Sequence, residues 1–210
     1  MPHAVAVDPS VAAIVRPVSA EFLAVRVVAL DTQMDAPLAH AAERMRGSSE
    51  MVDVTAAVRT MYKRVGLDPT KNRPSSEALW RRVKKGDPLP RVNSLVDVIN
   101  WCSLESKLPF GLYDAARIEG PVVLRLGHPD ESYSGIRKDQ VHVAGRLVLA
   151  DALGPFGNPT SDSARTMVTV ETTRAIVVIF APAALPASIA DAALALTRER
   201  VNTFCGGEPH

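Results

Sequence analysis

The sequence has few aromatic residues and almost no net charge. Phe, Trp and Tyr make up 5% of its 210 residues, and 24 Lys and Arg are balanced by 23 Asp and Glu. A surface built from aromatic base-stacking platforms is therefore not expected. A nucleic-acid partner would have to be met by a local basic patch, because the chain has no overall positive field.

Cysteine is also scarce, and the common catalytic motifs are missing. Cys102 and Cys205 lack metal-site spacing and are too few for a disulfide framework, and the five histidines are scattered. We find no G-x-S-x-G, G-x-x-x-x-G-K-[ST], G-x-G-x-x-G or H-E-x-x-H motif. The sequence therefore predicts no metal, no cofactor and no covalent nucleophile.

Long hydrophobic runs are missing as well. Asp8 and Pro9 interrupt the apolar N-terminus, and the longest apolar run, 175–187, contains Pro182 and Pro186. That run is too short to cross a bilayer, and the N-terminus does not have the composition of a secretory signal. We expect a cytoplasmic protein with no membrane contact.

The order of periodic segments predicts the fold class. A loose lead over 1–10 precedes a strand and helices, a run of strands follows, and a helix ends the chain. The predicted helices are 37–45, 49–65, a helix capped by Ser75 or Ser76 and ending at Gly86, the helix within 91–114, and 186–203. The predicted strands are 21–30, 121–126, a hairpin over 141–149, 166–170 and 175–180, with loops at 127–135 and 154–163. Strands without intervening helices favour an α+β fold with a mixed, largely antiparallel sheet and packed helices.

The rest of the chain is organised around residues 91–114, RVNSLVDVINWCSLESKLPFGLYD. An apolar helical face carries Leu95, Val96, Ile99 and Ser103, and a polar stripe of Asn93, Asp97 and Asn100 runs beside it. Pro109 and Gly111 are expected to end this helix, with Tyr113 and Asp114 in a following turn. The stripe could be the wall of a pocket, or its side chains could bond a neighbouring loop and hold the fold together.

The segment just before this stretch is locally basic. Between Lys63 and Arg91 nine cations face three acids, Asp68, Glu77 and Asp87. The side chains that we predict to contact phosphates are Arg73, Arg81, Arg82, Lys84, Lys85 and Arg91. Such a patch can bind nucleic acid by counterion release, although a solvated helix end would give the same composition.

Two segments carry a family resemblance. The pattern R-x-N-x-x-V-D-x-x-N-x-x-x-L-x-x-x-x-P-x-x-x-[FY]-D is met by Arg91, Asn93, Val96, Asp97, Asn100, Leu104, Pro109, Tyr113 and Asp114, and V-T-x-x-T-x-x-[AV] is met over 168–175. Both resemble the B3/B4 domain of the bacterial phenylalanyl-tRNA synthetase beta subunit. The resemblance covers 70–182 and implies a B3/B4-like core, with 1–69 as an N-terminal part of the same domain and 183–210 as a C-terminal helix and tail. Because 210 residues cannot hold the whole subunit, we expect a free-standing relative.

The resemblance also implies a function and a set of site residues. In the synthetase this domain hydrolyses tyrosine that is wrongly attached to tRNA, by attack of water on the aminoacyl ester. The implied partner is tRNA or aminoacyl-tRNA, and no metal is involved. The residues implied to line or support the pocket are Asn93, Asp97, Asn100, Tyr113, Asp114, Thr172 and Thr173.

Two positions depart from the family pattern. Gly111 stands where the synthetase has a histidine, and Val178 stands where it has a glutamate that contacts the tyrosine hydroxyl. Loss of such a contact can change discrimination by up to about 10⁴–10⁵-fold, so a preference for tyrosine is not expected. Three hypotheses stay open: a deacylase of another mischarged aminoacyl-tRNA, a non-catalytic module that binds tRNA or an amino-acid-like ligand, and a structural or protein-interaction role.

Overall fold

A computed structural model describes residues 3–48, 52–137 and 139–209. Its helices are α1 (Pro9–Ala12), α2 (Asp35–Gly47), α3 (Val52–Arg64), α4 (Ser75–Lys84), α5 (Ser94–Ser106) and α6 (Ala187–Cys205), with 3₁₀ turns η1 (Thr32–Met34) and η2 (Ala115–Arg117). Its strands are β1 (Val5–Val7), β2 (Val15–Leu23), β3 (Phe110–Asp114), β4 (Val122–Leu126), β5 (Ser132–Ser134), β6 (Gln140–His142), β7 (Leu147–Asp151), β8 (Gly154–Gly157), β9 (Ala175–Pro182) and β10 (Glu208–Pro209).

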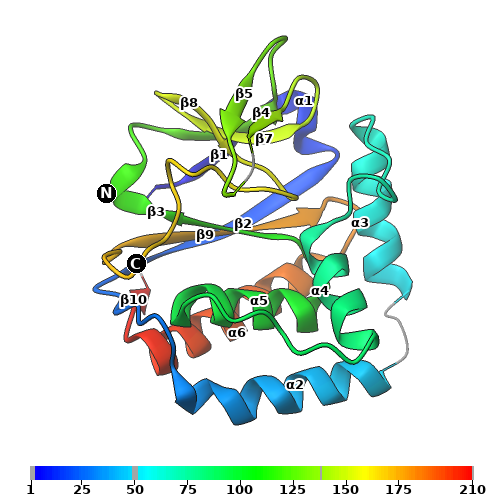
Figure 1. Cartoon of the computed structure of the whole chain (residues 1–210). Helices are drawn as coiled ribbons and strands as arrows, with labels where there is room; N and C mark the ends of the chain where they lie inside the picture. The colour runs from blue at the N-terminus through cyan, green and yellow to red at the C-terminus, as the bar shows by residue number, and fades with distance from the viewer. Residues whose placement is uncertain (1–2, 49–51, 138, 210) are drawn as a thin grey trace.

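The strands form two main sheets, with strand orders β1-β4-β7-β8 and β10-β2-β9-β3, and β5 pairs with β6 in a short ribbon. Strand β1 runs parallel to β4, whereas the other pairs of described strands are antiparallel. Figure 1 shows the second sheet between the first sheet and a layer that contains α2, α4, α5 and α6. This arrangement confirms the predicted α+β class with a mixed, largely antiparallel sheet.

Strand β9 lies at the centre of this arrangement. All eight of its residues are buried, and it pairs with β2 on one side and β3 on the other. Successive side chains of a strand point to opposite faces, so β9 supplies apolar contacts to the helices and to the first sheet alike. The sequence AIVVIFAP is continuously apolar because both faces of the strand are covered.

The N-terminal strands differ from the prediction. Residues expected to be a loose lead form β1, which pairs with β4, and the Asp8 N–H then bonds the Leu124 carbonyl at 2.9 Å. Strand β2 begins at Val15 rather than at 21 and ends at Leu23, just before Ala24 adopts a positive φ of 54°. Because a left-handed residue cannot continue a strand, the Val-rich segment that follows leaves the sheet.

The predicted hairpin over 141–149 is wrong. Strand β6 pairs with β5, and β7 pairs with β4 and β8. Between them a tight turn, closed by the Arg146 N–H on the Val143 carbonyl at 2.9 Å, redirects the chain from one partner to another. The same pairings place β5 and β8 in the regions predicted as loops. The strand expected at 166–170 is absent, because the Thr172 hydroxyl accepts from the Thr169 N–H and closes a turn there.

The end of helix α5 and the start of helix α4 also differ from the prediction. Helix α5 ends at Ser106, with Lys107 left-handed at φ 61°, and Tyr113 and Asp114 lie in strand β3 rather than in a turn. Helix α4 has Pro74 as its N-cap and no side-chain cap. The Ser76 hydroxyl, which we expected as a possible cap, donates to the Lys107 carbonyl at 2.8 Å and ties α4 to the end of α5.

Candidate functional site

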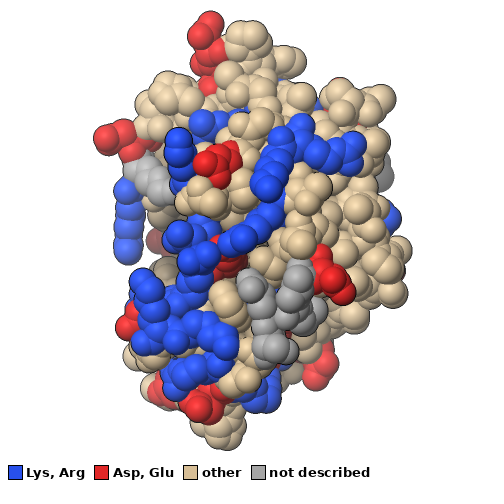
Figure 2. Space-filling view, turned by 90° about the vertical axis from the view of Figure 1, so that its right-hand side faces the viewer, with Lys and Arg blue, Asp and Glu red and all other residues tan. Residues whose placement is uncertain are grey.

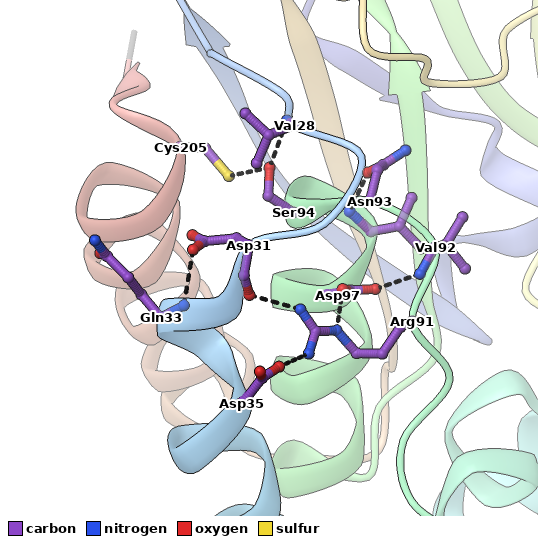
Figure 3. Close-up of polar contacts among 11 residues, drawn as sticks. Val28, Asp31, Gln33, Asp35, Arg91, Val92, Asn93, Ser94, Asp97 and Cys205 are labelled. Atoms are coloured by element: carbon purple, nitrogen blue, oxygen red, sulfur yellow. Dashed lines mark hydrogen bonds and ion pairs between the residues drawn. The ribbon is translucent and has the colours of Figure 1, made fainter.

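The N-terminus of α5 is fastened by the first members of the polar stripe. Asn93 is the N-cap, and its side-chain oxygen accepts from the Val96 N–H at 2.9 Å. The carboxylate of Asp97 accepts from the Val92 N–H at 2.8 Å and from Arg91 Nε at 2.7 Å. Figure 3 shows these groups converging in front of the helix. Because the Asp97 residue is only 1% exposed, its charge depends on these donors.

Arg91 extends this cluster to the start of α2. Its guanidinium donates to the Asp31 carbonyl at 2.6 Å and to the Asp35 carboxylate, in addition to Asp97 (Figure 3). These hydrogen bonds and charges raise the pKa of Arg91 although partial burial acts to lower it. Arg91 thus lies apart from the cations of α4, and its guanidinium joins α5 to η1 and α2.

Asp114 and Thr172 form a second internal cluster. The Thr172 hydroxyl donates to Asp114 Oδ2 at 2.9 Å, and Asp114 Oδ1 accepts from the Ala116 N–H at 3.0 Å. Both side chains are buried. Thr173 is exposed, and its carbonyl accepts from the Val25 N–H at 3.0 Å. These contacts fix the end of β3 against the segment that enters β9.

The two positions that depart from the family pattern lie directly opposite each other. Gly111 on β3 pairs with Val178 on β9. A Cβ added at Gly111 would lie 2.1 Å from the Tyr113 hydroxyl oxygen, and one added at Gly157 of β8 would lie 2.3 Å from it. The Tyr113 ring therefore occupies the space between the two sheets beside these glycines, and it packs edge-on against Phe156 with centroids 4.9 Å apart.

Tyr113 itself is fully buried. Burial raises the pKa of its hydroxyl well above the ordinary value, and the negative charge of Asp162 raises it further. The phenol therefore stays protonated at neutral pH. The resemblance implies two polar contacts to a ligand at positions 111 and 178. This chain has Gly111 and the apolar Val178 there, beside the neutral ring of Tyr113.

A cavity of about 270 Å³ lies on the other side of β3. Phe110 and Leu112, which alternate with Gly111 and Tyr113 along the strand, form one wall. Helix α5 contributes Val96, Ile99 and Asn100, and two loops contribute Ile136, Arg137, Asp162, Met167 and Val168. Of the predicted pocket residues, Asn100 lines this cavity, half-buried, whereas Asn93, Asp97, Asp114 and Thr172 bond to other parts of the chain.

The cavity combines an apolar interior with a few polar groups. Its carboxylate, guanidinium and carboxamide come from Asp162, Arg137 and Asn100. The sequence does not predict most of this wall, because Phe110 and Leu112 fall in a segment predicted as a helix exit and nothing in the loop sequence around Asp162 indicates which part of the chain it meets. The only sequence signal for a strand there is the short segment FGLYD itself, residues 110–114. Within residues 3–48, 52–137 and 139–209, no group of His, Cys, Asp and Glu is arranged to hold a metal ion.

A second feature is the basic surface at α4. Arg73, Arg81, Arg82, Lys84 and Lys85 line a hollow of about 520 Å³ together with Ala78, Trp80 and Asp87. In Figure 2 Lys and Arg side chains run as a band across the face on which α3 and α4 lie. The structure brings five of the six predicted cations together in this hollow, and the sixth, Arg91, does not line it.

The cations of this hollow are not equivalent. Arg81 bonds Glu77 at 2.8 Å, and the Lys84 ammonium bonds the carbonyls of Arg46 and Ser48 at 2.7 and 2.8 Å. Hydrogen bonds from Arg59, and then from Arg81, hold the pKa of Glu77 below its ordinary value. In the described part of the chain, Arg82 and Lys85 form no ion pair with a carboxylate. Arg73 likewise forms none there, and Arg82 donates to the Pro88 carbonyl at 2.6 Å, so these three charges have no carboxylate partner and can meet an anionic partner.

The fold and the site define a class of protein: an α+β domain of the kind found in the beta subunit of phenylalanyl-tRNA synthetase. It is shared with the crystal structure of an N-terminal fragment of that subunit from Pyrococcus horikoshii, with a TM-score of 0.53 and 14% sequence identity. That match covers 100% of this chain and 50% of the other. At this identity the likeness concerns the fold alone.

The chain belongs to the B3/4 domain family, whose model matches residues 57–200. Among curated proteins it is similar to the phenylalanine–tRNA ligase beta subunit of Brucella abortus, at 30% identity over 86 residues, which is 40% of this chain and 11% of that protein. It is also similar to the same subunit of Cutibacterium acnes, at 33% identity over 105 residues, or 49% of this chain and 12% of that protein. The chain thus spans about a tenth of the length of these relatives. No helix in its described part is long and apolar enough to span a membrane.

Proposed function

We propose that this chain acts on aminoacyl-tRNA. In this proposal the cations of α4 bind the tRNA backbone, and the cavity between α5 and β3 holds the aminoacyl group. The observation that carries the proposal is the cavity, an apolar space with a few polar groups in its wall. Such a combination is typical of small-ligand sites, in which the apolar part provides affinity and the polar groups fix orientation.

The cavity wall fits the parts of an aminoacyl ester. Val96, Ile99 and Leu112 provide contacts for an apolar side chain. The Asp162 carboxylate complements an α-ammonium group, and the Asn100 carboxamide can donate to the ester carbonyl. Because the wall of the cavity is mostly apolar, the proposed amino acid has an apolar side chain and differs from tyrosine.

The proposed reaction is hydrolysis of a mischarged ester. Water attacks the carbonyl carbon, the bond to the ribose oxygen breaks, and the products are the free amino acid and the tRNA with its terminal hydroxyl restored. A second candidate is binding without turnover. It is favoured by the described lining of the cavity, which contains neither the histidine nor the glutamate that the family resemblance leads us to expect.

A deacylation assay tests the first candidate. We expect protein-dependent loss of the ester for one tRNA charged with an incorrect, apolar amino acid, measured across a panel of correctly and incorrectly charged tRNAs. Leu112→Trp should abolish this loss because the larger ring fills the cavity. The matched control is Leu153→Trp, since Leu153 is 60% exposed and outside the cavity wall.

The outcomes separate the two candidates. Ester loss that Leu112→Trp removes and Leu153→Trp retains supports the hydrolase. If no charged tRNA is hydrolysed but charged tRNA is bound more tightly than uncharged tRNA, the binding module is supported instead. If neither hydrolysis nor tRNA binding is found, both candidates are wrong.

The basic surface gives a separate prediction. Arg82→Gln with Lys85→Gln should weaken tRNA binding equally for different tRNA sequences, because phosphate contacts carry no sequence information. The slope of log K against log salt concentration should fall by about one unit for each side chain that contacts a phosphate. The measurement is a salt titration of tRNA affinity. Arg26→Gln with Arg198→Gln, two exposed arginines outside the hollow, is the control, and an equal loss in both double variants would contradict a local site.

A further inference from the structure

A second cavity, of about 330 Å³, lies where the segment after α3 meets the end of β6 and the loop that follows β8. It shares no lining residue with the cavity between α5 and β3. The side chains that matter here are those of Lys71, Asn72, Arg73, His142, Arg146 and Thr160. They come from three separate segments, so only the folded chain brings them together.

The charged side chains in the wall of this cavity are all positive. Lys71, Arg73 and Arg146 supply three cations, and none of the described residues that line the cavity is Asp or Glu. Among the described residues none of these three cations forms an ion pair with a carboxylate. Asp68, three residues before Lys71, accepts from the hydroxyl and backbone of Thr70, and those bonds, with a smaller effect from the charge of Lys71, lower its pKa. Unneutralised cations around one hollow repel each other, and a bound anion removes that repulsion.

The floor of the cavity is polar and held in place. The Tyr62 hydroxyl donates to the Pro159 carbonyl at 2.9 Å and lies 2.9 Å from the Thr160 hydroxyl. Asn158 accepts from the Thr160 and Ser161 N–H groups at 2.8 and 2.9 Å. Because Tyr62 and Asn158 are buried, the loop beneath the cations has a fixed shape, and a ligand does not have to order it.

We propose that this cavity binds a phosphate group. Three cations with flanking amide and hydroxyl groups match a tetrahedral anion, which accepts several charge-assisted hydrogen bonds at once. Arg73 lines both this cavity and the α4 hollow, so the two are neighbours, and Figure 2 shows a band of Lys and Arg side chains across this face. The phosphate belongs either to a nucleic-acid strand that crosses both hollows or to a free nucleotide. The first source rests on the proposed function, whereas the second does not.

The test is a binding experiment with two probes, adenosine 5′-monophosphate and uncharged tRNA, each measured by calorimetry. Lys71→Gln with Arg146→Gln should weaken binding of at least one probe by about 10-fold or more, and the salt slope for tRNA should fall by about one to two units. The conservative pair Lys71→Arg with Arg146→Lys keeps both charges and should bind normally. Arg26→Gln with Arg198→Gln is again the matched control, and thermal melts check that all variants are folded.

Each result decides the question. A selective loss for the nucleotide identifies the free ligand, with adenosine as the uncharged comparison, and a selective loss for tRNA identifies the strand. If neither probe binds the wild-type protein, or if the cavity variant binds like the control variant, the phosphate site does not exist. This binding experiment uses no aminoacyl ester, so its result does not depend on whether the protein hydrolyses one. The contribution of Arg82 and Lys85 to tRNA binding is measured separately, in the double variant of those two residues.

Discussion

Gly111→Ala is expected to destabilise the protein by about 1–3 kcal/mol, the usual cost of inserting atoms into a filled core. The added Cβ would lie 2.1 Å from the Tyr113 hydroxyl oxygen and 2.6 Å from Cζ of the same ring, so the ring must move. That ring is confined by Phe156 and by Gly157 on the opposite sheet. The measurement is the free energy of unfolding from denaturant titration.

A double-mutant cycle isolates the cause. With Tyr113→Leu in place, the added methyl of Gly111→Ala has room, so the second substitution should cost less than it does in the wild type, by about 0.5–3 kcal/mol. Gly47→Ala is the control, because no described residue lies within 4 Å of a Cβ at that helical glycine. Equal costs of Gly111→Ala with and without the tyrosine ring would show that the ring does not fill this space.

Asp97→Ala is expected to cost about 3–5 kcal/mol, the range for removing one partner of a buried ion pair. The substitution leaves the Val92 N–H and Arg91 Nε, both of which bond Asp97 in a partly buried place, without this acceptor. It also loosens Arg91, which holds η1 and α2 to the start of α5. Chemical denaturation again provides the measurement, and a large fall in the midpoint is expected.

The control and the second readout distinguish two interpretations of Asp97. Asp191→Ala, an exposed carboxylate on α6, should change stability by less than about 0.5 kcal/mol. Folded Asp97→Asn protein should keep the wild-type affinity for charged tRNA, because Asp97 is not in the cavity wall. A specific loss of aminoacyl recognition at unchanged stability would instead support the pocket-wall interpretation of the polar stripe.

Much of the fold was predictable where one segment carries its own signal. Strand β9 is predictable from its continuous apolar run, and helix α6 is predictable from its helical periodicity and the glycine at its end, because each signal lies within the segment itself. The failures concern partners. The segments VHV and LVL look like the two arms of one hairpin, but β6 pairs with β5 and β7 pairs with β4. The sequence of a short strand does not specify which strand it pairs with.

The candidate site was predictable only in part, for a related reason. Asn100 could be proposed as a wall residue because it lies on a helix with a clear period. Phe110 and Leu112 could not, because the sequence predicts the end of that helix at their positions. Asp162 and Met167 reach the cavity from a loop whose position depends on the whole sheet. The basic surface was easier, because five of its cations lie within 13 consecutive residues, 73–85.

The position of β2 has a consequence for the order of folding. This N-terminal strand lies between β9 and β10, the last two strands of the chain, and β1 pairs with β4 from the middle. During synthesis β2 therefore has no strand partner until β9 has left the ribosome. Pairing between such distant segments requires closure of a very large loop, which slows folding. The apolar residues of β2 remain uncovered during that interval, so a nascent chain of this protein depends on protection from aggregation until β9 can pair with β2.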